Sequence, residues 1–79
     1  MEKKRLIVSL RSERLKSELA RAGKTYRWLG DMTGVHCHYI GALMRHVRNP
    51  GPKLRYKIHR AMMGLSMMGW HEVFRENKR

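Results

Sequence analysis

Apolar residues recur along most of the chain at the three- and four-residue spacing of amphipathic helices. This pattern predicts five short helices, separated by glycine and proline residues that end helices or make turns. The predicted helices cover residues 12–22, 26–33, 37–46 and 52–63. Ser66 is the predicted N-cap of a last helix that carries Met67, Trp70, Val73 and Phe74. The sequence therefore predicts an all-α fold, a compact bundle of five helices.

Each predicted helix combines an apolar stripe with residues that define its ends. Ser12 and Thr25 are predicted N-caps, and Pro52 suits the first turn of the fourth helix. Gly30 costs the second helix about 1 kcal/mol relative to alanine, which suggests that another helix passes close by. The residues predicted to face the core are Leu15, Leu19, Ala22, Trp28, Leu29, Met32, Ile40, Leu43, Met44, Val47, Leu54, Ile58, Ala61 and Met62.

The two ends of the chain differ from this helical pattern. Residues 1–11 form a basic N-terminal arm, in which the apolar run Leu6–Leu10 is predicted as an extended arm or an added strand. Residues 12–75 form the predicted domain, and residues 76–79 are predicted to be a frayed tail. A length of 79 residues is enough for one domain at most.

Charge is the most unusual property of the composition. The formal net charge is +12, and no carboxylate occurs from Met32 to His71. A strongly basic chain favours a polyanion as its partner, and nucleic acid is the usual one. The chain lacks an apolar run long enough to cross a membrane, and a single cysteine fits a reducing compartment, so we expect a cytoplasmic protein associated with the nucleoid.

The segment Thr25–Arg45 has the pattern of a helix-turn-helix, which is two short helices around a turn that contains glycine. Gly34 permits the positive φ that such a turn needs. The outer face of the second of these helices is small and nearly uncharged, carrying Cys37, His38, Gly41, Ala42 and Arg45. A helix of this kind fits into the major groove of DNA.

This segment resembles the lambda-repressor-like (Cro/repressor-type) DNA-binding domains. The resemblance covers residues 12–74 and rests on the Gly34-Val35 turn, on Ile40-Gly41-Ala42-Leu43 and on the Arg48-Asn49-Pro50 loop. The chain departs from the family in having Tyr26 in place of glutamine, Gly30 in place of alanine, and Met44-Arg45-His46 in place of Glu-x-Gly. A histidine can take the left-handed conformation that a helix end such as His46 requires.

The resemblance implies a role for particular residues. Cys37, His38, Gly41, Ala42 and Arg45 are expected to contact base edges. Phosphate contacts are expected from Tyr26, Arg27, Arg48, Asn49, Lys53 and Arg55. The family typically binds as a homodimer, and the predicted dimer interface consists of Met67, Trp70, Val73 and Phe74.

The run His36-Cys37-His38 also suggests a metal site or a nucleophilic cysteine. Structural zinc uses four ligands, and a cysteine nucleophile needs a base and an orienting group, with no carboxylate near in the sequence. The start of a recognition helix explains the same residues. We therefore expect no metal, cofactor or small-molecule ligand, no membrane partner and no enzymatic activity.

These observations predict a stand-alone regulator of transcription, resembling those of phages and mobile elements. It would bind double-stranded DNA as a homodimer on a palindromic operator, most simply as a repressor that blocks polymerase. Two alternatives stay open. One is a nonspecific basic nucleic-acid-binding protein, and the other is a protein-interaction module such as an antitoxin or antirepressor that uses the methionine-rich C-terminal region.

Overall fold

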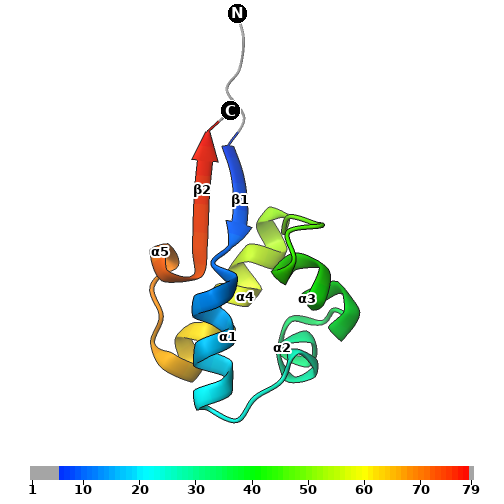
Figure 1. The fold of residues 1–79 in the computed structure, drawn as a ribbon, viewed down its shortest axis with the longest axis vertical. Coiled ribbons are helices and arrows are strands. Elements are labelled where there is room, and N and C mark those ends of the chain that lie inside the picture. The colour runs from blue at the N-terminus through cyan, green and yellow to red at the C-terminus, as the bar shows by residue number, and fades with distance from the viewer. Residues whose placement is uncertain (1–5, 79) are drawn as a thin grey trace, which may run out of the picture.

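The computed structural model describes residues 6–78, and of the predicted arm and tail residues 1–5 and Arg79 lie outside this range. The helices α1 to α5 are joined by two strands, β1 and β2, one at each end (Figure 1). The expected all-α fold is therefore wrong in one respect, since a small sheet accompanies the five helices. In chain order the elements are β1 Leu6–Leu10, α1 Ser12–Arg21, α2 Tyr26–Thr33, α3 Cys37–Met44, α4 Pro52–Ser66, α5 Trp70–Val73 and β2 Phe74–Lys78.

The sheet joins the two ends of the described chain. The strands β1 and β2 pair antiparallel, with Leu10 opposite Phe74 and Leu6 opposite Lys78. Val8, Leu10 and Phe74 are buried, so one face of the pair packs onto the helices. The expectation of a strand at Leu6–Leu10 is confirmed, whereas residues 76–78 belong to β2 rather than to a frayed tail.

Local signals fix the bounds of α2. The hydroxyl of Thr25 accepts a hydrogen bond from the backbone N–H of Trp28 at 3.1 Å, and Gly34 ends the helix with a φ of 78°. Both predictions are confirmed. Ser12, however, is not an N-cap, because Arg11 holds that position and the Ser12 hydroxyl donates to the carbonyl oxygen of Met44 at 2.6 Å.

The second half of the chain differs from the predicted bounds. The helix α3 ends at Met44, and His46 follows in the left-handed conformation, with a φ of 61°. The helix α4 runs through Gly64 to Ser66, so Ser66 ends a helix instead of capping the next one. A short α5 then begins after Gly69, whose N–H donates to the carboxylate of Glu72 at 2.8 Å.

Most of the predicted core is confirmed. Leu15, Leu29, Ile40, Leu43, Ile58 and Met62 are fully buried, and Val8, Leu10, Val73 and Phe74 join them from the sheet and α5. Three predictions are wrong: Ala22 is exposed, Met32 is 55% exposed and Val47 is 66% exposed. In each case the residue lies at or near a helix end, where the chain leaves the core.

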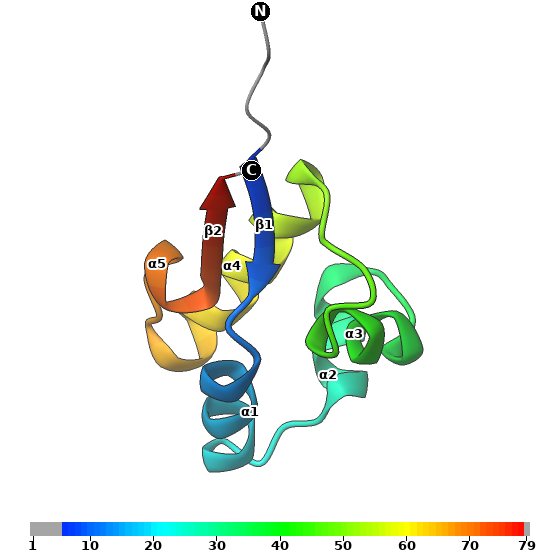
Figure 2. The ribbon, with the colours of Figure 1, turned by 45° about the horizontal axis from the view of Figure 1, so that its top comes forward.

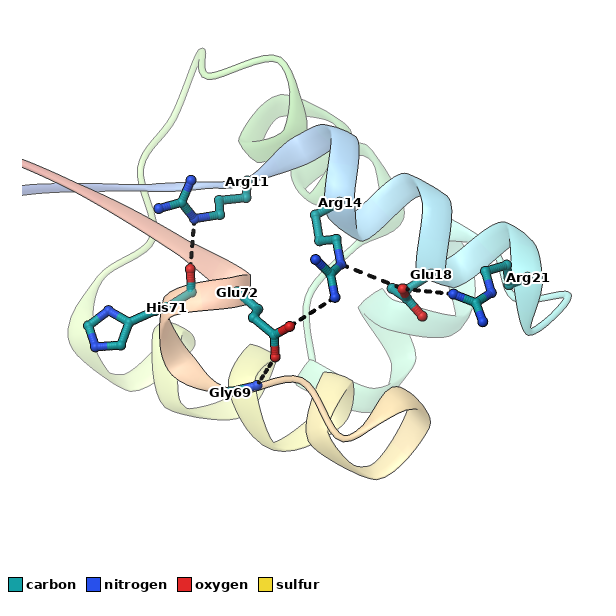
Figure 3. Close-up of polar contacts among 7 residues, drawn as sticks. All are labelled: Arg11, Arg14, Glu18, Arg21, Gly69, His71 and Glu72. Carbon is teal, nitrogen blue, oxygen red and sulfur yellow. Dashed lines mark hydrogen bonds and ion pairs between the residues drawn. The ribbon is translucent and has the colours of Figure 1, made fainter.

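An ion pair between Arg14 and Glu72 joins α1 to α5, and further ion pairs within α1 extend from it (Figure 3). Arg14 contacts Glu72 at 2.8 Å and Glu18 at 3.5 Å, and Arg21 contacts Glu18 at 3.3 Å. Arg11 adds a hydrogen bond from Nε to the carbonyl oxygen of His71 at 2.7 Å. Glu18 and Glu72 are therefore paired with arginines on this side of the molecule, whereas α2 and α3 pack together on another side (Figure 2).

Candidate nucleic-acid interface

The helices α2 and α3 are joined by a very tight turn. The N–H of Val35 donates to the carbonyl oxygen of Gly30 at 3.0 Å. A Cβ atom on Gly30 would lie 2.5 Å from the carbonyl oxygen of Val35 and 3.3 Å from the backbone nitrogen of Cys37. The backbone of the turn and of the start of α3 therefore approaches α2 closely at Gly30, as expected from a glycine inside the helix.

The start of α3 is capped by a histidine. His36 is the N-cap residue, and its Nδ1 atom accepts a hydrogen bond from the backbone N–H of His38 at 3.1 Å. This bond satisfies one of the free N–H groups at the helix start. His36 was not among the predicted contact residues, although its position before the predicted helix was a signal for this role.

One concave surface joins the start of α2 to the outer face of α3. It encloses about 460 Å³ and is lined by Thr25, Tyr26, Arg27, Cys37, His38, Gly41 and Arg45. Six of the eleven predicted DNA-contact residues are among these seven. We call this surface the α2–α3 hollow. None of the described residues that line it carries a carboxylate.

The residues of the hollow differ in how far they reach solvent. Arg27, His38 and Arg45 are exposed, and Tyr26 and Cys37 are half-buried. Gly41 is buried, and a Cβ atom there would lie 3.2 Å from Nη1 of Arg45. The Arg45 guanidinium therefore covers Gly41, which corrects the expectation that Gly41 itself lies open on the outer face.

The remaining predicted contacts lie outside the α2–α3 hollow. Ala42 is half-buried, and Arg48, Asn49 and Lys53 are exposed on the α3–α4 loop and the first turn of α4. Arg55 is half-buried, and its Nε donates to the carbonyl oxygen of Pro50 at 2.9 Å. One N–H of this guanidinium therefore braces the loop that carries Arg48 and Asn49.

His46 ties the end of α3 to the N-terminal part of the fold. Its Nε2 atom lies 2.9 Å from the carbonyl oxygen of Leu10 and 3.2 Å from the hydroxyl of Ser12. A carbonyl oxygen only accepts, so Nε2 carries the proton in this contact. His46 thereby fixes where the α3–α4 loop leaves the core.

Asp31, Glu18 and Glu72 do not line the α2–α3 hollow. Asp31 lines a second concavity of about 670 Å³, together with Met32, Tyr56, Lys57 and Arg60. Glu18 and Glu72 pair with arginines on α1. Among the described residues, the exposed groups around the α2–α3 hollow and the following loop are therefore neutral or cationic.

Most of the predicted dimer interface is covered by the chain's own fold. Val73 and Phe74 are 0% and 1% exposed, because they pack into the core of their own chain. Trp70 is half-buried and donates from Nε1 to Glu76 at 3.0 Å. Of the four residues only Met67 is exposed, at 86%, and it follows α4 as a C-cap residue in the left-handed conformation. The prediction failed because the last helix is shorter than expected. It covers only Trp70–Val73, and the chain then continues as β2.

A different set of apolar side chains is exposed. Tyr56, Met63 and Met67 are 58%, 52% and 86% exposed. Tyr56 and Met63, seven residues apart, lie on one side of α4, away from the buried Ile58, and Met67 follows at the end of the helix. The seven-residue spacing of Tyr56 and Met63 in the sequence already indicates that they share one side of the helix.

Comparisons with protein-family models, with curated proteins and with solved structures found no significant match. Among residues 6–78, none of the helices has both the length and the apolar character that crossing a membrane requires.

Proposed function

We propose that this chain is a sequence-specific regulator of transcription that binds double-stranded DNA in the cytoplasm, as a repressor of the lambda-repressor-like type. The observation that carries the proposal is the α2–α3 hollow. It combines two exposed cations, Arg27 on α2 and Arg45 directly after α3, with the start of α3, and no described residue of its lining is acidic. A phosphate backbone and the adjacent base edges fit this combination.

Phosphate contacts supply most of the affinity in this proposal. Four of the proposed phosphate contacts are exposed. Arg27 lies at the start of α2, Arg48 and Asn49 lie in the loop between α3 and α4, and Lys53 lies at the start of α4. The brace from Arg55 to Pro50 orders the loop before DNA arrives, which lowers the entropy lost on binding. Tyr26 adds a hydroxyl from α2.

Base readout comes from the few polar groups of α3. His38 and Arg45 are exposed, and Cys37 and Ala42 lie beside them. Arginine commonly contacts guanine, and alanine can contact the methyl group of thymine. Gly41 contributes by leaving room for the Arg45 side chain, which it contacts closely.

The proposal includes a homodimer on a palindromic operator. The exposed residues Tyr56 and Met63 on α4, with Met67 at its end, form the apolar surface that two copies would bury together. The concavity beside Tyr56 is lined by Asp31, Lys57 and Arg60, so both signs of charge lie at one end of this surface. A two-fold contact brings each patch against its own copy and can pair these charges across the axis.

Selection of bound sequences from random double-stranded DNA tests the proposal directly. We expect a short palindromic motif, because a dimer presents two identical recognition helices. On the selected DNA, about five phosphate contacts per subunit predict a log–log salt slope near −4 to −5 per subunit. No enrichment of any sequence would favour the nonspecific alternative, and a flat salt response would exclude DNA binding through these cations.

A further inference from the structure

His36, Cys37 and His38 bring three metal-binding side chains together at the start of α3. The ligand atoms of the three residues all lie within 4.8 Å of one another. Sγ of Cys37 lies 3.8 Å from Nδ1 of His36, and the two imidazole rings have centroids 4.7 Å apart. Cys37 is a free cysteine and both histidines are exposed, so an ion has access to the cluster.

The donor set and its spacing suit a borderline or soft transition-metal ion. Zinc commonly binds thiolate and imidazole, in four-coordinate sites whose ligand atoms lie about 3.3–3.7 Å apart. The 3.8 Å separation of Sγ and Nδ1 is already close to that range. Rotation of the exposed His38 side chain can bring its ring nitrogen to the same distance from both atoms. Three protein ligands leave a fourth position for water.

The cap of α3 and a metal ion compete for the same lone pair. Nδ1 of His36 has one lone pair, and it accepts the N–H of His38. Binding through Nδ1 takes this lone pair directly. Binding through Nε2 of a neutral ring moves the proton to Nδ1, which then no longer accepts. Either mode of coordination therefore releases the N-terminal cap of α3.

We propose that His36, Cys37 and His38 form a Zn²⁺-binding site whose occupation uncaps α3. The Cys37 thiol gives its proton to solvent and binds as the thiolate, together with one nitrogen from each histidine. As a regulatory step, which rests on the proposed DNA-binding function, occupation withdraws Cys37 and His38 from base edges. The cations outside the cluster keep their phosphate contacts, so sequence discrimination falls while nonspecific binding remains.

Metal binding is tested first without DNA, by titrating the full chain with Zn²⁺ against a chromophoric chelator under reducing conditions. We expect one equivalent per chain. Cys37→Ser, His36→Asn and His38→Asn should each weaken binding about tenfold or more, because each removes a ligand and even the loss of a group that only orients a ligand costs about 10–100-fold. His36→Asn is the sharpest variant, because asparagine caps helices well but lacks the imidazole. His71→Asn makes the same change at an exposed histidine outside the cluster and should bind as the wild type does.

The outcomes separate this proposal from the proposed function. Wild-type binding no tighter than that of Cys37→Ser overturns the site, and half an equivalent per chain overturns a site within one chain. In the second arm, Zn²⁺ should lower the affinity of the wild type for the selected DNA at least tenfold and leave His36→Asn unchanged. Equal affinity with and without Zn²⁺ overturns the regulatory step alone, and failure of the metal-free chain to bind DNA overturns the proposed function instead.

Discussion

The Cβ atom that Gly30 lacks would lie 2.5 Å from the carbonyl oxygen of Val35. This oxygen belongs to the turn between α2 and α3 and cannot move without moving the start of α3. We therefore expect Gly30→Ala to destabilise the fold by about 1–3 kcal/mol, the usual range for overpacking, despite the better helix propensity of alanine. Urea denaturation followed by circular dichroism measures the change.

Gly64 provides the matched control for this substitution. It lies inside α4, and a Cβ atom there would meet nothing within 4 Å. Gly64→Ala should therefore stabilise the fold by about 0.5–1 kcal/mol. If Gly30→Ala stabilises the protein as Gly64→Ala does, the close approach of the turn to α2 is wrong.

Glu72 makes the stability depend on pH. The N–H of Gly69, and then the guanidinium of Arg14, hold the pKa of Glu72 below its ordinary value of 4.5. A carboxylate with a lowered pKa in the folded state stabilises the fold above the unfolded pKa, and this contribution is lost as the pH falls through the folded pKa. Glu72→Gln should therefore lower the melting temperature at pH 7, and the difference from the wild type should close as the pH falls below 4.5.

Glu13→Gln is the control for Glu72, since Glu13 is exposed on α1 and makes no ion pair with the residues that the structure describes. We expect little change in its melting temperature at any pH. Equal effects of the two substitutions would mean that net charge, and not the contacts of Glu72, sets the pH dependence.

Local chemistry made the helices predictable, and distant contacts explain most of the errors. The bounds of α2 followed from Thr25 and Gly34, because a cap and a left-handed glycine act within a few residues. The partner of Leu6–Leu10 lies more than 60 residues away, and the polar segment Phe74–Lys78 shows no strand pattern of its own. Strand pairing of this kind depends on tertiary contacts that the periodicity of the chain does not encode.

For the candidate site, the sequence predicted which residues share one side of α3 but not the contacts that their side chains make. Sequence spacing placed Cys37, His38 and Arg45 on one side of α3, and the structure brings them together with Arg27. Spacing did not reveal that Arg45 covers Gly41, or that Arg55 braces the α3–α4 loop, because both depend on where a long side chain folds back. The sequence places His36, Cys37 and His38 next to one another, but only the structure shows that their ligand atoms all lie within 4.8 Å of one another.

The exposed residues Tyr56, Met63 and Met67 predict where the proposed homodimer forms. Met63→Glu places a charge between the other two, where Met63 is 52% exposed, and should convert the proposed dimer to a monomer. Val47→Glu, at a residue 66% exposed outside α4, should leave the dimer intact. Sedimentation equilibrium measures both. A wild-type chain that stays monomeric at all concentrations would contradict the homodimer, and Met63→Glu that still dimerises would move the interface elsewhere.

Lys53 and His38 test the proposed division between affinity and specificity. Lys53→Ala should weaken binding to all DNA sequences alike and reduce the salt slope by about 0.9, because it removes one of the proposed phosphate contacts. His38→Ala should weaken the selected site by about 1–3 kcal/mol and change nonspecific binding little.

Lys16→Ala removes the same charge from the exposed side of α1, outside the α2–α3 hollow, and should leave the salt slope unchanged. Binding constants for the selected site and for a scrambled site, each measured over a range of salt concentrations, decide between these outcomes. A change of sequence preference in Lys53→Ala, with a uniform loss in His38→Ala, would mean that the start of α4 and not the start of α3 faces the bases.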